Sequence, residues 1–330
     1  MTLFILCLFS LLALSLRILP FSGDVFAASG VQFTTNDAYY HMYAVDNLAQ
    51  NFPRLSPYLP YLGYPGTQSG PGIYFFDWLL AAGIWLLSLG NPTPEIIDTI
   101  AAYYPAILGA LVVIPVYFIG KALAGRWAGL ISAAVIAVLP GEFLGRSILG
   151  STDQHIAESL LTTTAMMFLI LAIKHKKLVY GIFACLFWVL YFLTWSGALL
   201  FGFIVFLYFG IQLVVVIPGE AHGASPGKQG RALGVILIVG VLSALIFPFA
   251  VQSGISLFYP SGAGLTTAEM QPILSPGGNF TLAVIVANYG FAFFLSMAAL
   301  LLMLILTLKR QQDYSLILVW SLVILAAMFG

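Results

Sequence analysis

Long apolar runs, separated by short polar stretches, dominate the sequence from end to end. A helix needs about 20 mainly apolar residues to cross the hydrocarbon core of a bilayer. Apolar runs of roughly that length predict ten candidate helices, at residues 2–20, 72–90, 96–120, 127–144, 156–173, 178–194, 196–217, 232–250, 282–308 and 313–329. The pattern therefore predicts an all-α fold, a polytopic bundle of transmembrane helices.

Composition agrees with this interpretation and excludes several others. Hydrophobic residues make up 61% of the 330 residues, charged residues only 7%, and the mean hydropathy is +1.02, unlike a soluble domain. The 12 basic and 12 acidic residues cancel, so no basic surface indicates a nucleic-acid partner. Cys7 and Cys185 lie inside apolar runs and indicate neither a disulfide framework nor a cysteine metal site.

The positions of the basic residues indicate which candidates cross the membrane. If all ten crossed, Lys121, Arg126 and the cluster at 174–177 would lie outside, against the preference of Lys and Arg for cytoplasmic loops. Residues 72–90, which Asp77 and two tryptophans interrupt, are the best candidate for an external helix lying in the interface instead. With that change, nine of the 12 basic residues face the cytoplasm: Lys121, Arg126, Lys174, Lys176, Lys177, Lys228, Arg231, Lys309 and Arg310.

The resulting topology has about nine spans and a cytoplasmic N-terminus. Residues 1–330 form one transmembrane domain, with external segments at residues 21–95, 145–155 and 251–281. The first apolar run could also be a signal peptide, cleaved near Ala27-Ala28-Ser29. Because no basic residue precedes that run, we favour an uncleaved span, and both alternatives send residue 21 onward to the external side.

Three acidic clusters fall on the predicted external side. They are Asn36-Asp37-Ala38-Tyr39-Tyr40-His41, Asp153-Gln154-His155 with Glu158, and Thr266-Thr267-Ala268-Glu269. Each has a purely structural alternative, since Asp37 and Asp153 could cap helices and Glu269 could be a solvated acid. Taken together, carboxylates with one imidazole suit Mg²⁺ or Mn²⁺, whereas the lack of clustered Cys or His disfavours Zn²⁺.

These clusters, with Tyr64-Pro65-Gly66 and Arg146, resemble the catalytic subunit of N-oligosaccharyltransferases in its single-subunit archaeal or bacterial form. That family has an acidic motif in the first external loop and an Asp-x-Asp/His/Glu motif after the third span. A Thr-Ile-x-Glu-like motif follows in a long fifth external loop. All three occur here in order, although Thr267 stands where the family usually has Ile or Val.

The resemblance implies a membrane glycosyltransferase of the GT-C type. Such an enzyme moves an oligosaccharide from a polyprenyl (dolichol-type) phosphate or pyrophosphate donor to the Asn amide of an Asn-x-Ser/Thr sequon. The family pattern assigns a divalent cation, Mn²⁺ or Mg²⁺, to four residues: Asp37, Asp153, His155 and Glu269. It also assigns Asp37 and Glu269 to the acceptor amide, and Arg146 to the site as a basic residue. From the residue alone, Arg146 could be a snorkelling arginine at a helix end.

The implied partners are the lipid-linked donor, an acceptor polypeptide with a sequon, and membrane lipid. The implied location is the cell membrane, with the active face external. The family continues into further spans and a soluble sequon-recognition domain with a Trp-Trp-Asp-Tyr-Gly-like motif. No two of the six tryptophans here are adjacent, so we expect the chain to be a truncated form that corresponds to the family's front part.

Other functions remain open at this point. Another transferase that uses lipid-phosphate sugars would have an acidic first loop but would not need the second and third motifs together. A transporter would carry its polar residues within spans, near the midplane of the bilayer. A non-catalytic assembly subunit would retain the three motifs only as remnants.

Overall fold

The computed structural model describes residues 1–54, 75–175, 177–195, 198, 201–210, 291–308 and 314–329. The chain divides into two compact units. In the first unit, the described residues are 1–54, 75–167 and 186–195. In the second unit, they are 168–175, 177–185, 198, 201–210, 291–308 and 314–329. Each unit is described by itself.

The first unit contains every element that positions the candidate site. In chain order these are α1 (Thr2–Ile18), α2 (Ser22–Val25), β1 (Phe26–Ala27), β2 (Gly30–Val31), α3 (Asn36–Asn51), α4 (Phe75–Leu87), α5 (Pro94–Leu111), α6 (Val113–Ala137) and α7 (Glu142–Gly145). The two strands pair antiparallel, with Phe26 opposite Val31. Two further helices, α8 (His155–His175) and α9 (Leu178–Thr194), contribute residues to both units.

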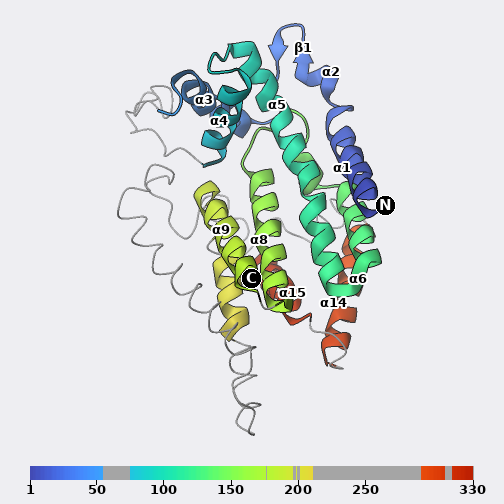
Figure 1. Ribbon diagram of the computed structural model, residues 1–330. Coiled ribbons are helices and arrows are strands. Elements are labelled where there is room, and N and C mark those ends of the chain that lie inside the picture. Colours follow the sequence, from blue (N-terminus) through green and yellow to red (C-terminus); the bar gives the residue numbers. More distant parts are fainter. Residues whose placement is uncertain are drawn as a thin grey trace. The chain divides into compact units, whose positions relative to one another are not determined.

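The second unit is also helical in its described part. It contains Phe201–Gly210, α14 (Phe291–Leu308) and α15 (Ser315–Phe329), and Figure 1 labels the last two. α14 and α15 pack against each other, and the rings of Phe201 and Trp320 meet edge to face, 5.0 Å apart. Apart from the two-residue strands, the regular elements among the described residues are helices, which confirms the predicted all-α class.

Two helical stretches in the described part are long and apolar enough to cross a membrane. They are Pro94–Ala137, which comprises α5 and α6, and His155–His175. Shorter apolar helices lie at Thr2–Ile18, Phe75–Leu87, Leu178–Thr194, Phe201–Gly210, Phe294–Leu308 and Ser315–Ile324. These helices are compatible with a membrane protein, whereas the count of nine spans and the sides that the loops face stay predictions.

The turn predicted between residues 120 and 127 lies inside α6. Ala124 leaves the helical conformation, and Gly125 has a φ of +88°, in the left-handed region that favours glycine. Beyond this turn the helix folds back on itself. A Cβ on Gly120 would lie 2.7 Å from Oγ of Ser132 and 3.0 Å from Cα of Gly129. Glycines thus let the two halves of α6 approach closely, which confirms the predicted helix–turn–helix.

The first acidic motif lies on α3, which a compact apolar core holds against α4 and α5. Met42, Val45 and Leu48 recur every third residue on one face of α3. This face packs on α4 and α5, whose buried residues are Leu80, Ala81, Ile84, Ile97 and Ala101. Residues at this spacing share one side of a helix, so this face of α3 holds the helix against α4 and α5.

The second acidic motif is fixed beside the first by backbone hydrogen bonds. The N–H of Thr34, just before α3, donates to the carbonyl of Gly150 over 3.0 Å. The N–H of Gly150 in turn donates to Ala102 of α5 over 2.9 Å, and the hydroxyl of Thr152 donates to Ala101 over 2.8 Å. The segments that lead into both motifs are therefore held side by side on α5.

Candidate functional site

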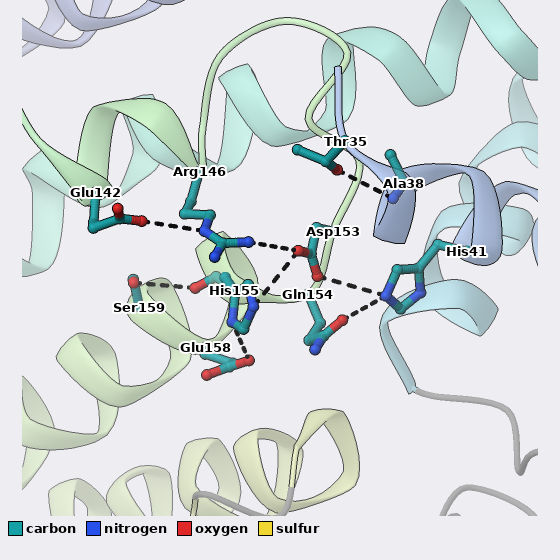
Figure 2. A network of polar contacts seen from close by, with 10 residues as sticks. All are labelled: Thr35, Ala38, His41, Glu142, Arg146, Asp153, Gln154, His155, Glu158 and Ser159. Carbon is teal, nitrogen blue, oxygen red and sulfur yellow. Dashed lines mark hydrogen bonds and ion pairs between the residues drawn. The ribbon is translucent and has the colours of Figure 1, made fainter. Parts of the chain in front are cut away.

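The carboxylate of Asp153 is the centre of a polar network, shown in Figure 2. Asp153 is fully buried. Its Oδ2 atom lies 3.4 Å from Nη1 of Arg146 and 3.6 Å from Nε2 of His155. Its Oδ1 atom lies 3.5 Å from Nε2 of His41. The first two acidic motifs, more than a hundred residues apart in the sequence, thus meet at this carboxylate.

Arg146 brings a partly exposed positive charge to the network. It follows α7 directly, and its Nε donates a 3.2 Å hydrogen bond to Oε2 of Glu142, one helical turn earlier. Its Nη1 donates to Oδ2 of Asp153, which has almost no contact with solvent. The side chain is 41% exposed, so the guanidinium can also face an incoming ligand. Arg146 is therefore part of this polar network.

A second carboxylate orients His155. Its Nδ1 lies 3.1 Å from Oε1 of Glu158, three residues later on the same face of α8. Trp195 packs edge to face against the imidazole ring, with 6.4 Å between ring centroids. When a carboxylate holds one ring nitrogen of histidine, the tautomer and the ring plane are fixed. The other nitrogen of His155, Nε2, is the one that faces Asp153.

His41 contacts two side chains whose part in the site the sequence did not reveal. Its Nδ1 lies 2.6 Å from Oδ1 of Asp77, and its Nε2 lies 2.5 Å from Oε1 of Gln154. All three residues are buried. An acid in an apolar run was a signal for this contact, because a buried carboxylate requires a partner. The sequence analysis used Asp77 only as an argument against a membrane span.

The network shifts the pKa values of His41 and Asp153 in opposite directions. Burial by itself would lower the pKa of His41, but the carboxylates of Asp77 and Asp153 outweigh it and raise that pKa to about 10. His41 is therefore a cation whose two ring N–H groups both donate. Burial by itself would raise the pKa of Asp153, but His41, His155 and Arg146 outweigh it and hold that pKa below its ordinary value.

Asp37 is exposed in the first turn of α3, four residues before His41. Positions four apart share a helix face, so Asp37 lies on the same face of α3 as His41, which contacts the second motif. Asp37 is not the helix cap, because the hydroxyl of Thr35 accepts the hydrogen bond from the N–H of Ala38. The structural alternative for Asp37 is wrong in this respect. Glu269, with the third motif, and Tyr64-Pro65-Gly66 lie outside the described residues.

The surroundings of Asp153 and His155, two of the four predicted metal ligands, are compatible with a divalent cation. Oδ1 of Asp153 is buried and has no hydrogen-bond partner among the described residues, which is costly for a carboxylate. The Glu158 carboxylate on Nδ1 of His155 is the outer contact that histidine ligands usually have. Within the described ranges, no three His, Cys, Asp or Glu side chains are grouped closely enough to hold a metal. A complete set requires residues from elsewhere.

The fold and this centre define a class of protein before any comparison: a helical protein with long apolar helices and a buried carboxylate–histidine centre where helices begin. Comparison with known proteins then gives the family. The sequence profile described as oligosaccharyl transferase STT3, N-terminal, matches residues 7–307. The chain belongs to this family.

Individual relatives agree with this assignment. The dolichyl-monophosphooligosaccharide–protein glycotransferase AglB of Haloferax volcanii is 30% identical over 283 residues, which are 78% of this chain and 25% of that protein. The apo oligosaccharyltransferase of Archaeoglobus fulgidus has a TM-score of 0.74 at 24% identity, covering 100% of this chain and 48% of that chain. The latter likeness shows a shared fold.

Two further structures of the Archaeoglobus fulgidus enzyme contain bound groups. One is a complex with zinc and sulfate, with a TM-score of 0.71 at 24% identity over 99% of this chain and 46% of that chain. The other is tethered to an acceptor peptide containing the NVT sequon, with a TM-score of 0.72 at 23% identity over 100% of this chain and 47% of that chain. The chain spans about half the length of the solved relative.

Proposed function

We propose that this protein is an oligosaccharyltransferase. It transfers an oligosaccharide from a polyprenyl (dolichol-type) phosphate or pyrophosphate to the side-chain amide of Asn in an Asn-x-Ser/Thr sequon. The observation that carries the proposal is the meeting of the first and second acidic motifs at Asp153, in a chain of this family. The name of the Haloferax volcanii relative and the sequon peptide of the Archaeoglobus fulgidus enzyme support this donor and this acceptor.

The acceptor needs activation, because the lone pair of an amide nitrogen is delocalised into its carbonyl. We assign Asp37 and Glu269 to the two N–H bonds of the acceptor amide. Carboxylates that accept both bonds favour a twisted amide whose nitrogen is a better nucleophile. In the transfer, a bond forms between this nitrogen and the anomeric carbon, while the bond from that carbon to the phosphate oxygen breaks and one amide proton is lost.

The residues proposed to hold a divalent cation are Asp37, Asp153, His155 and Glu269. When bound, Mn²⁺ or Mg²⁺ would supply positive charge for the departing phosphate. Oxygen ligands with a single imidazole are the basis for preferring these ions. The zinc in the Archaeoglobus fulgidus complex supports a cation in that enzyme without identifying the one used here.

Arg146 is proposed to bind the donor phosphate. A guanidinium recognises phosphate oxygens through paired hydrogen bonds. Arg146 is exposed enough to receive a ligand, and its ion pair with Asp153 fixes where the charge lies. The same charge would stabilise the phosphate as it leaves.

The proposed location is the cell membrane, with a multi-pass chain whose active face is external. About nine spans, a cytoplasmic N-terminus and external segments at residues 21–95, 145–155 and 251–281 complete this topology. Membership of the family and the apolar helices support membrane insertion. The distribution of basic residues supports the assignment of sides.

The test is glycan transfer to a fluorescent sequon peptide by the full-length protein in detergent, supplied with a lipid extract that contains the donor. We expect Mn²⁺- or Mg²⁺-dependent transfer that Asp37→Ala and Glu269→Ala each abolish. Asp24→Ala, at an exposed acid of α2, is the matched control and should retain transfer. Transfer that persists in both site variants would overturn the proposal, and so would an inserted wild-type protein without transfer.

A further inference from the structure

The buried contact between Asp77 and His41 connects α4 to the second acidic motif. Asp77 lies in the first turn of α4, His41 in the second turn of α3, and Gln154 immediately before α8. Three separate elements therefore meet at one imidazole ring. Phe76 packs edge to face against this ring, with 5.3 Å between ring centroids.

The two ring nitrogens of His41 contact different side chains. Nδ1 faces Oδ1 of Asp77 at 2.6 Å, the shorter of the two contacts of His41 with carboxylates. Nε2 faces Oε1 of Gln154 at 2.5 Å and Oδ1 of Asp153 at 3.5 Å. Asp77 thus fixes the ring plane, and the ring plane fixes where the second N–H points. Its nearest partner is Oε1 of Gln154, the residue next to Asp153, and the same nitrogen lies 3.5 Å from Oδ1 of Asp153, the oxygen that Arg146 and His155 do not face.

The free-energy cost of burying either charged group alone explains why Asp77 and His41 are paired. A buried carboxylate or imidazolium without a partner costs several kcal/mol, roughly, whereas a hydrogen-bonded pair offsets much of that cost. Both Asp77 and His41 are at least 98% buried. Neither would be stable in this place without the other. The pair has no exposed edge through which a substrate could reach it directly, so it acts through Asp153.

We propose that Asp77 and His41 are positioning residues for Asp153, which set the direction of its carboxylate in the site. The inference rests on the proposed function, in which Asp153 is a ligand of the cation. The imidazole of His41 bonds to Gln154 and lies 3.5 Å from Oδ1 on the interior side, while Oδ2 faces His155 and Arg146. The apolar helix α4, which carries Asp77, thereby becomes part of the catalytic centre without touching substrate.

Outer contacts of this kind change metal affinity or activity by about 10- to 100-fold when they are lost. We therefore expect Asp77→Asn to weaken Mn²⁺ binding to the full-length protein by about 10- to 100-fold. The binding is measured without donor or acceptor, by electron paramagnetic resonance of the free ion. In glycan transfer, kcat should fall at fixed Mn²⁺, while KM for the sequon peptide should not change, because the pair does not contact the acceptor. A role limited to folding would not divide kcat from KM in this way.

Asp46→Asn is the matched control, because it removes a half-buried acid from the same helix pair, five residues beyond His41. It should leave both Mn²⁺ affinity and kcat unchanged. If Asp77→Asn elutes as an aggregate, the double variant Asp77→Asn with His41→Gln replaces it, since removing both charges of a buried pair is less disruptive than removing one. The double variant should also bind Mn²⁺ more weakly than wild type.

The variant Asp153→Ala distinguishes a failure of the positioning role from a failure of the proposed cation site. If Asp153→Ala loses Mn²⁺ binding while the Asp77 variants bind and turn over like wild type, the positioning role is overturned and the proposed function stands. If Asp153→Ala binds Mn²⁺ as tightly as wild type, the cation site itself is wrong, and the positioning role is overturned with it.

Discussion

The side chain of Arg17, on α1, packs against Gly109 of α5. A Cβ atom on Gly109 would lie only 2.5 Å from Nε of the arginine. The guanidinium is fully buried, and its Nε donates a 2.8 Å hydrogen bond to the hydroxyl of Ser147. A further hydrogen bond runs from Nη1 to the carbonyl of Ala137, at the C-terminus of α6, where the helix dipole favours a cation. A glycine on α5 thus allows α1 to hold the segment that leads to Asp153.

This relationship predicts the effect of a single methyl group. Gly109→Ala should destabilise the protein by about 1–3 kcal/mol, the usual cost of overpacking, because the buried side chains of Arg17 and Ser147 would have to shift away from the added methyl group. Thermal unfolding in detergent, followed by tryptophan fluorescence, should show a clearly lower midpoint. Gly83→Ala on α4 is the control, since a Cβ there meets nothing within 4 Å. Equal midpoints for the Gly109 variant and wild type would contradict the close approach.

Glu158 offers a prediction about the outer contacts of the site. Glu158→Gln should weaken Mn²⁺ binding by about 10-fold or more, because the amide orients Nδ1 of His155 less strongly than the carboxylate does. Ser159→Ala, one residue later, removes a hydroxyl that only donates to the backbone of His155, and it should bind Mn²⁺ normally. Titration of both variants with Mn²⁺ checks the prediction. Equal affinities would mean that His155 needs no orientation by Glu158.

Arg146 offers a prediction that separates its two partners. Arg146→Ala should reduce kcat of glycan transfer by about 100-fold, the usual loss when a donor to a developing anion is removed. Glu142→Gln should have little effect, because its contact with Arg146 is a surface ion pair of about 0–1 kcal/mol. Steady-state kinetics with a sequon peptide measures both. A loss for Glu142→Gln as large as that for Arg146→Ala would show that orientation, and not charge at the phosphate, limits the rate.

Asp46 predicts a dependence of stability on pH. Burial first, and the charge of Asp98 second, raise the pKa of Asp46 to about 6, above its ordinary value. The folded protein therefore binds a proton more tightly at this position than the unfolded chain does. The contribution of Asp46 to stability is complete below the ordinary pKa and is lost as the pH rises through about 6.

Asp46→Asn should accordingly raise the unfolding midpoint at pH 8 and leave it nearly unchanged at pH 4. We expect a rise of roughly 2–4 °C, the effect of about 1 kcal/mol in a chain of this kind, because partial exposure screens the charge. Thermal unfolding of both proteins across this pH range tests the prediction. The same difference between the proteins at both pH values would contradict it.

The sequence by itself determined the class of fold and indicated the segments of the candidate site. Apolar runs of about 20 residues leave a chain few options other than membrane helices, because the bilayer offers the backbone no hydrogen-bond partners. The basic pair Lys121 and Arg126 marked the turn that Gly125 makes within α6. The acidic motifs around Asp37 and Asp153 were visible because acids are rare in such a composition, and the structure brings their segments together.

Only the tertiary structure decided which side chains complete the site. Nothing local connects Asp77 to His41, or His41 to Gln154, since the partners are 36 and 113 residues apart and lie on different elements. Arg17 lies near the end of an apolar run, and its partner Ser147 is 130 residues away. Periodicity reveals which face of a helix is apolar, whereas a buried charge finds its partner only when separate helices pack. The identity of these positioning residues is therefore a property of the packed helices and not of any single segment.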